Sequence, residues 1–311
     1  MHKKAKVLLC SMGTSFMLGG CSGMINSNNY QKNEQTKDTQ AAPSEETRIS
    51  VQDYTGEGYA LPYGRVTDEI ADKNLAQIVE AATSFFKEKY KTDVTVHNVV
   101  GAKDGATVFV ESKGEPHFYT YAVVPIDEVA KKVWTERIWA DEFQVENAIK
   151  GGLYSMIFKE EFNQLDDYFD SLAAEGQITG KTYEAIQNVG GKGFSTPYYF
   201  ISMRSKEAAI QPVYDLFMRN PDESAENLRK AFEDNSFSAE NLFINIQLFM
   251  ADPNAKPDNK LFDRIIKDLE EMTSIPRGSY SFVLNDNFID KQSSSGMGDN
   301  SLDLTNDIIK D

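Results

Sequence analysis

Cysteine and histidine are scarce in this chain of 311 residues, which holds two cysteines and three histidines. Both cysteines, Cys10 and Cys21, lie within the first 21 residues, so the rest of the chain can form no disulfide, thiolate metal site or cysteine nucleophile. Beyond His2, only His97 and His117 remain. The sequence therefore offers little material for catalysis by cysteine or histidine.

Positive charge is also in short supply. Aspartate and glutamate number 48 against 32 lysines and arginines, which gives a formal net charge of -16 at pH 7. Such a chain repels the phosphates of nucleic acids, so we expect no nucleic-acid partner. With 41% hydrophobic and 26% charged residues, it can still bury a substantial core. This composition excludes disordered, collagen-like and polytopic membrane proteins.

The amino-terminal segment has the pattern of a secretory signal peptide. Residues 1–6 carry three lysines and no acid, and residues 7–20 are apolar or small. As a helix, that second run would span about 21 Å, whereas a bilayer core of about 30 Å needs about 20 residues. We therefore predict a signal peptide over residues 1–20 and no permanent membrane span there.

The sequence Leu18-Gly19-Gly20-Cys21 resembles the lipobox of bacterial lipoproteins. Small residues before the cysteine allow a protease to cut there, and the thiol is the nucleophile that accepts a diacylglycerol group. The resemblance implies that Cys21 becomes the lipidated amino terminus, with an S-diacylglycerol group and, in many bacteria, an N-acyl chain that is commonly palmitoyl. Two or three acyl chains anchor a protein stably. The expected location is the extracellular face of the cell membrane. Cys10 follows Leu9 and lacks the small residue before it, so we place it in the removed peptide.

Composition divides the remaining chain into three parts. Residues 21–59 form a polar tether rich in Asn, Gln, Ser and Thr, and residues 60–290 form the globular body. A division of the body into two lobes near residue 140 stays open. Residues 291–311 are predicted to be a flexible acidic tail. Three tyrosines near the end of the tether are expected to dock it on the body, with an aromatic ligand platform as the alternative: Tyr54, Tyr59 and Tyr63.

Hydrophobic periodicity predicts an α+β fold for the body. Apolar residues at helical spacing predict an amphipathic helix over residues 68–90, and three runs of β-branched and aromatic residues after it predict an antiparallel meander packed on that helix. A mixed C-terminal half follows. It begins with a predicted helical stretch that is capped by Asp127 and reaches residue 138, followed by helix over 142–172 that is divided at Gly151 and Gly152. Strands are then predicted at 198–203, 242–250 and 279–284, and helices at 206–219, 225–234 and 259–272.

Two glycine-containing motifs could mark a binding site. Residues 176–182 end in Gly-Lys-Thr like a nucleotide-binding loop, but only three residues separate the glycines where that loop needs four. We predict a turn there, with Thr179 capping a short helix. Residues 190–195 form a glycine-rich loop before a strand. We predict a connection that uses positive φ values, with the rim of a binding site as the alternative.

No residue pattern defines a catalytic or metal site. His97 and His117 fall on the first and third meander strands, about 9–10 Å apart at about 4.8 Å per strand step, which is too far for one zinc ion. We expect each to be solvated or hydrogen-bonded. Carboxylate pairs are too numerous to single out an acid and a nucleophile. Residues 299–307 lack the glycine and the final glutamate of an EF-hand loop. We therefore predict no metal, no cofactor and no catalytic residue.

The charged start, the lipobox, the polar tether and the acidic body rich in Tyr and Phe together resemble an uncharacterised family of lipoproteins from staphylococci and related Gram-positive bacteria. That family has no assigned activity, so the resemblance implies anchoring and location but no chemistry. We expect a surface-exposed, membrane-anchored lipoprotein that is not an enzyme and that binds a protein, a cation or a wall polymer. The alternative is a cell-wall-directed hydrolase that uses paired carboxylates.

Lipidation of Cys21 can be tested by metabolic labelling with an alkynyl fatty acid. The wild-type protein should be labelled, and Cys21→Ala should lose all label because no other thiol follows the cleavage site. Cys10→Ala is the matched control and should label normally. Label that persists on Cys21→Ala would show that the anchor is elsewhere.

Overall fold

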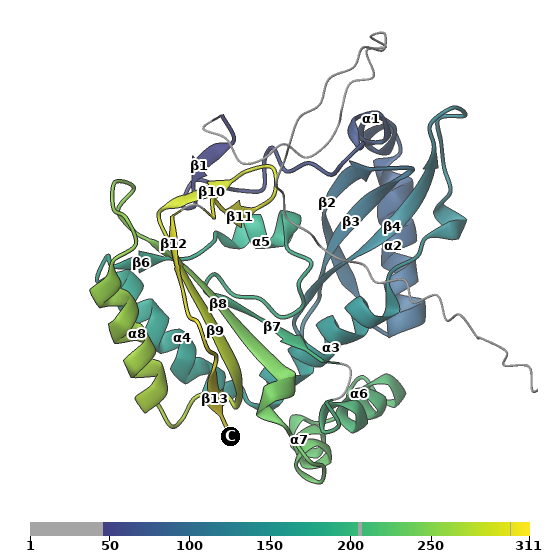
Figure 1. The fold of residues 1–311 in the computed structure, drawn as a ribbon. Helices are drawn as coiled ribbons and strands as arrows, with labels where there is room; N and C mark the ends of the chain where they lie inside the picture. The colour runs from purple at the N-terminus through teal and green to yellow at the C-terminus, as the bar shows by residue number, and fades with distance from the viewer. Residues whose placement is uncertain (1–45, 205–206, 299) are drawn as a thin grey trace, which may run out of the picture. The chain divides into compact units, whose positions relative to one another are not determined.

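The structure is a computed structural model that describes residues 46–204, 207–298 and 300–311. The signal peptide, the lipobox and Cys21 lie outside the described residues. Within these ranges the chain forms eight α-helices and three β-sheets, which confirms the α+β class (Figure 1). The described residues all fall within one compact unit.

The helix predicted over 68–90 is two helices, α1 (Arg65–Lys73) and α2 (Leu75–Tyr90). Asn74 separates them, and its side-chain amide donates a 2.8 Å hydrogen bond to the carbonyl of Ile70. Asparagine competes with the helix for backbone partners in this way, which explains the break. The apolar faces of both helices pack on the meander, as the periodicity predicts.

The predicted meander is confirmed as β2 (Val94–Ala102), β3 (Gly105–Ser112) and β4 (Tyr119–Asp127). These strands are antiparallel in sequential order, and a two-residue strand, β5 (Lys132–Val133), extends the sheet. Gly101 is required for the contact with α1, because a Cβ there would lie 2.3 Å from the backbone nitrogen of Asp68. A β-bulge between Val96 and Asn98 makes His97 the extra residue of its strand.

The expected helix after Asp127 is wrong. The Asp127 carboxylate accepts hydrogen bonds from the backbone nitrogens of Val129 and Ala130, which closes a turn into β5. Only a short 3₁₀ helix, η1 (Thr135–Arg137), follows. An aspartate can stabilise a turn as readily as a helix start, so its identity alone did not decide between them.

The long helical region is confirmed as α3 (Glu142–Ile157) and α4 (Lys159–Ala174), but the division is at Phe158 and not at the glycine pair. Gly151 and Gly152 lie inside α3. A Cβ on Gly152 would come 2.6 Å from the carbonyl oxygen of His117, so this glycine allows the helix to approach the chain that leads into β4.

The C-terminal half forms a second, six-stranded sheet. Strand β8 (Leu242–Met250) pairs with β7 (Tyr199–Met203) and β6 (Ile178–Thr179), and it runs parallel to β9 (Gly278–Asn285). The other elements of this half are α5 (Tyr183–Val189), α6 (Ile210–Arg219), α7 (Ala225–Glu233), the 3₁₀ helix η2 (Ala239–Asn241) and α8 (Asn259–Glu271). The long strands and helices predicted here are confirmed, with end positions shifted by a few residues.

One face of this sheet is buried under helices. Tyr199 of β7 stacks on Phe162 of α4 with ring centroids 6.0 Å apart, and Phe282 of β9 stacks on Phe262 of α8 at 4.9 Å. Figure 1 shows α4 and α8 beside the strands that they cover. Aliphatic residues of β8 complete this core: Leu242, Ile244, Ile246 and Leu248.

The boundaries predicted at residues 59 and 291 are wrong. In the region assigned to the tail, β12 (Ser301–Asp303) and β13 (Ile308–Lys310) both pair with β9. In the region assigned to the tether, β1 (Arg48–Ser50) pairs with β10 (Phe288–Asp290), which also pairs with β11 (Ser295–Gly296). Strands of two or three residues are too short to show a period of two, so the sequence pattern could not reveal them.

The docked segment 46–59 can be tested through Tyr54, which is 1% exposed and donates a 2.8 Å hydrogen bond to the carbonyl of Lys291. Tyr54→Ala should lower the free energy of unfolding by about 3–5 kcal/mol, because it empties a buried aromatic site. Tyr54→Phe should cost only about 1 kcal/mol. Tyr183→Ala is the exposed control, expected within about 0.5 kcal/mol of wild type in urea unfolding. Equal costs for Tyr54→Ala and the control would contradict the docking.

Candidate functional site

The second face of the six-stranded sheet is only partly covered. Side chains alternate along the strands, so the residues between the buried ones point to this face and are half-buried. Asn245 joins three strands there: its amide donates to Ser202 Oγ at 3.1 Å, and its carbonyl oxygen accepts from Ser281 Oγ at 3.2 Å. The remaining side chains of this open face are Phe200, Phe243, Gln247 and Val283.

A cavity of about 120 Å³ lies at one end of the open face. Its walls come from four segments that are separated in the sequence: the chain around Tyr59, residues 181–200 from Lys181 through α5 and the glycine-rich loop into β7, Gln247 of β8, and the turn after β10. Its polar lining residues are Tyr59, Lys181, Lys192, Ser195, Thr196, Tyr198, Tyr199, Gln247, Ser293 and Ser294. Two lysines and no carboxylate line the cavity.

The segment that resembles a nucleotide-binding loop places Lys181 in this cavity. Gly180 lies directly against Pro197, where a Cβ would come 2.4 Å from the carbonyl oxygen, and the Lys181 backbone nitrogen donates to that oxygen at 3.0 Å. The cap of α5 is Thr182, whose hydroxyl accepts from Ala185 N, and not Thr179 as predicted. The motif therefore forms a strand end and a helix cap, with the lysine side chain turned into the cavity.

The ammonium group of Lys181 is held by a neutral partner. Its Nζ donates a 2.6 Å hydrogen bond to the carbonyl oxygen of Ser294. Burial, with a smaller contribution from the charge of Lys192, lowers the pKa of Lys181 to about 7. Among the described residues, neither lysine lies within ion-pair distance of a carboxylate.

Lys192 comes from the glycine-rich loop and reaches the same cavity. Its Nζ lies 4.8 Å from the centre of the Phe200 ring, a cation-π contact. The side chain is exposed, yet desolvation lowers its pKa, because a concave surface removes part of the hydration shell of an ammonium that still meets water. Gly191 and Gly193 have φ of 73° and 87°, as predicted for this loop. The loop is both a connection and the rim of a cavity.

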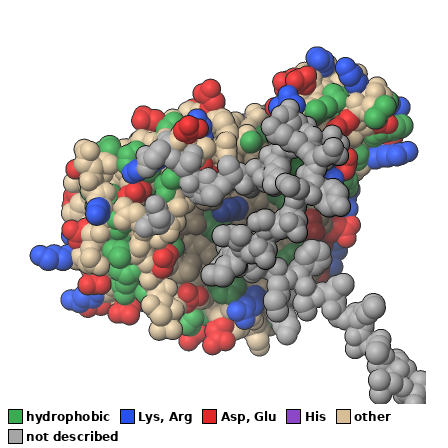
Figure 2. All heavy atoms as spheres, turned by 45° about the horizontal axis from the view of Figure 1, so that its top comes forward, with side chains coloured by type: hydrophobic (Ala, Val, Ile, Leu, Met, Phe, Trp, Pro, Cys, Tyr) green, Lys and Arg blue, Asp and Glu red, His purple; other side chains and the backbone are tan. Residues whose placement is uncertain are grey.

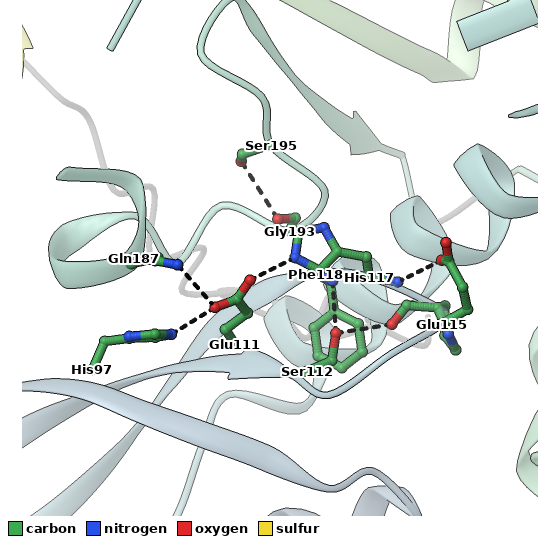
Figure 3. Close-up of polar contacts among 10 residues, drawn as sticks. His97, Glu111, Ser112, Glu115, His117, Phe118, Gln187, Gly193 and Ser195 are labelled. Carbon is green, nitrogen blue, oxygen red and sulfur yellow. Dashed lines mark hydrogen bonds and ion pairs between the residues drawn. The ribbon is translucent and has the colours of Figure 1, made fainter. Parts of the chain in front are cut away.

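A second polar cluster lies on the meander, on the other side of α5 (Figure 3). The Glu111 carboxylate on β3 bonds His97 Nε2 at 2.6 Å and His117 Nε2 at 2.8 Å, and it accepts from Gln187 Nε2 of α5 at 3.3 Å. The bulge at His97 accompanies this contact. Both histidines are hydrogen-bonded, as predicted, but only His97 lies in a strand, because His117 precedes the start of β4 by two residues.

The carboxylate of Glu111 is stabilised in its charged form. Burial opposes ionisation, but the hydrogen bonds from His117 and His97 outweigh it and hold the pKa of Glu111 below its usual value of 4.5. Glu111 does not stand out in the sequence, because a lone glutamate in a strand carries no local signal. No group of three or more His, Cys, Asp or Glu side chains with a metal-binding arrangement occurs among the described residues.

One carboxyl group on α4 is bound to a tyrosine of the six-stranded sheet. Asp166 on α4 accepts a 2.7 Å hydrogen bond from the Tyr199 hydroxyl. Burial raises the pKa of Asp166 to about 6 despite that bond, and the neighbouring charges of Asp170 and Asp167 add to the effect. Asp166 does not line the cavity, although Tyr199 does.

The fold and the cavity define an α+β protein with a small, lysine-lined cavity, and comparison with known proteins supplies its family. Residues 41–310 match the family described as "Protein of unknown function (DUF1672)", and the chain belongs to that family. It is similar to the crystal structure of a DUF1672 family protein from Staphylococcus aureus subsp. aureus Mu50, with 18% sequence identity, a TM-score of 0.69, and coverage of 85% of this chain and 98% of that one. No curated protein matches.

Within the described ranges, no helix is both long and apolar enough to cross a membrane.

Glu111 provides a test of the second cluster. Glu111→Gln should lower the free energy of unfolding at pH 7 by about 1–3 kcal/mol, because it removes the charged acceptor shared by two histidines. The folded-state pKa of Glu111 is lowered, so its contribution is complete above the ordinary value of 4.5 and is lost as the pH falls further. The difference between wild type and Glu111→Gln should therefore shrink below pH 4.5. Glu88→Gln, at an exposed site on α2, is the control, and an equal cost for it would refute the role of the cluster.

Proposed function

We propose that this protein is a lipoprotein anchored through Cys21 on the extracellular face of the cell membrane, and that its body is a non-catalytic module that binds a small ligand in the lysine-lined cavity. The anchor rests on the lipobox resemblance. The binding role rests on the cavity itself, where hydroxyl, amide and ammonium groups from four separate segments converge beside an aromatic ring. Small-molecule sites combine a concave surface with a few converging polar groups in this manner.

The lining of the cavity argues against hydrolysis by carboxylates. A glycosidase needs two carboxyl groups on opposite sides of the bond that it cleaves, and no Asp or Glu lines this cavity. The histidines are bound to Glu111 on the far side of α5 and do not contribute to its walls. The cavity holds ligand-binding groups without a proton-transfer pair.

Asp166 is the observation that favours the alternative, a cell-wall-directed hydrolase. A carboxyl group with a pKa near 6 is suited to general acid catalysis, and Asp170 lies near enough to influence its charge. Tyr199 holds the Asp166 carboxylate away from the cavity, however, and the Tyr198 hydroxyl binds Asp170 at 2.9 Å. Both carboxylates are therefore engaged by tyrosines of β7 and the loop before it, which supports a structural role.

The proposal is tested with the mature, full-length protein in mild detergent. A panel of muropeptides, monosaccharides, amino acids and their phosphates is screened by thermal unfolding, since a ligand of the folded state raises the melting temperature. At least one compound should stabilise wild type but not Gln247→Trp, which fills the cavity. Val283→Trp is the matched control, because Val283 pairs with Gln247 on the same open face without lining the cavity. It should respond like wild type.

The hydrolase is tested in parallel with purified peptidoglycan. We expect no release of muropeptides from wild type. Release that Asp166→Asn abolishes would overturn the non-catalytic proposal, and so would a panel in which no compound stabilises the protein.

A further inference from the structure

We infer that the cavity takes the anionic group of its ligand, a carboxylate or a phosphate, and holds it between Lys181 and Lys192. This inference rests on the proposed function and adds the chemical class of the ligand. It starts from an imbalance of charge: two ammonium groups share one small cavity that contains no carboxylate.

Some lysines of this acidic protein are matched by carboxylates, unlike the two in the cavity. On α2, Lys87 lies 2.9 Å from Asp93 and Lys89 lies 2.7 Å from Glu142. Figure 2 shows acidic and basic side chains interspersed over one face of the molecule. With 48 acidic residues against 32 basic ones, a lysine placed at random would meet a carboxylate more often than another lysine. In the cavity, by contrast, Lys181 and Lys192 lie together without an Asp or Glu among the lining residues.

Buried charges are costly unless a counter-charge or hydrogen bonds compensate them. The Ser294 carbonyl supplies one hydrogen bond to Lys181, but it carries no net charge, and Lys192 adds repulsion. A bound oxyanion would remove this repulsion and offer acceptors to both ammonium groups in charge-assisted hydrogen bonds. An anion would therefore interact with these two lysines more strongly than a neutral molecule would.

The lining next to the two lysines can contact the remainder of the ligand. Phe200 lies under Lys192, and Gln247 lies on the open face next to it, so a ligand held by its anionic end can extend over an aromatic ring and an amide. These groups suit the hydroxyl-bearing carbon skeleton of an organic acid or a phosphorylated alcohol. The small volume of the cavity excludes a folded protein segment, which leaves such a compact group as its occupant.

Binding should depend on pH through Lys181. The titratable groups that share its cavity are Lys192 of the glycine-rich loop and three tyrosines, Tyr59, Tyr198 and Tyr199. Burial raises the pKa of each tyrosine above 10, so all three stay neutral between pH 6 and pH 9. Lys181, with a pKa of about 7, loses its charge over that interval, and anion binding should weaken accordingly.

The test uses three matched compounds with the mature, full-length protein: glycerate, glycerol 3-phosphate and uncharged glycerol. Isothermal titration should detect binding of at least one anion and none of glycerol. The response to glycerate against glycerol 3-phosphate distinguishes a carboxylate site from a phosphate site. Where glycerate binds, it also reports the pH dependence, since its carboxylate stays ionised from pH 6 to pH 9. Otherwise phosphate-ester binding is compared at pH 7.5 and pH 9, above its own second ionisation.

Lys181→Met should weaken anion binding about tenfold or more, the effect of losing one charge-assisted hydrogen bond, and it should retain only the pH dependence that Lys192 supplies. Because this variant also loses its bond to Ser294, Lys192→Met provides a second substitution, at an exposed side chain, and should weaken binding as well. Lys103→Met, at the exposed turn between β2 and β3, is the control and should bind like wild type.

The outcomes separate this inference from the proposed function. If a neutral compound of the panel binds in the cavity and both anions fail, the binding module stands and the anion site is refuted. Anion binding that survives Lys181→Met and Lys192→Met unchanged would also refute it. If no compound binds, both proposals fall.

Discussion

The alternation of side chains along β8 is the constraint on which the rest of the structure depends. Its aliphatic residues enter the same hydrophobic core as the buried residues of α3, α4 and α8, and each buried side chain contributes about 1.5–3 kcal/mol. The polar residues between them, such as Asn245 and Gln247, must then point to the other face. A shift of register by one residue would bury these amides, so the hydrophobic pattern fixes the floor of the cavity as firmly as it fixes the core.

The cavity also needs the two ends of the described chain. Pairing of β1 with β10 brings the segment before Tyr59 beside the turn that carries Ser294. Val51, the residue after β1, and Ile289 of β10 join Ala185 and Val189 of α5 in a separate hydrophobic cluster. This cluster holds α5 in place, and α5 in turn separates the cavity from the Glu111 cluster. Short strands with little sequence signal thus position the candidate site.

The two polar clusters differ in whether the charge of the central side chain is compensated. At Glu111 the charge is matched by hydrogen bonds from two histidines, and the pKa of the carboxyl is lowered. At Lys181 the charge is unmatched, and burial lowers the pKa of the ammonium. The first cluster connects β2, β3, the segment before β4 and α5, which is a structural task. The second retains a cost of burial that a ligand can relieve, which is typical of a binding site.

The sequence by itself determined the α+β class, the meander, the long strands of the second half and most of its helices, because these elements depend on hydrophobic periods within one segment. It also singled out the glycine-rich loop and the Gly-Lys-Thr segment, although neither motif disclosed that its lysine shares a cavity with the other. Only the tertiary structure decided that Lys181 and Lys192 meet, that Glu111 lies between two histidines, and that residues 46–59 and 291–311 contribute strands. Each of these outcomes depends on contacts between different elements, and such contacts leave no periodic signal in either element alone.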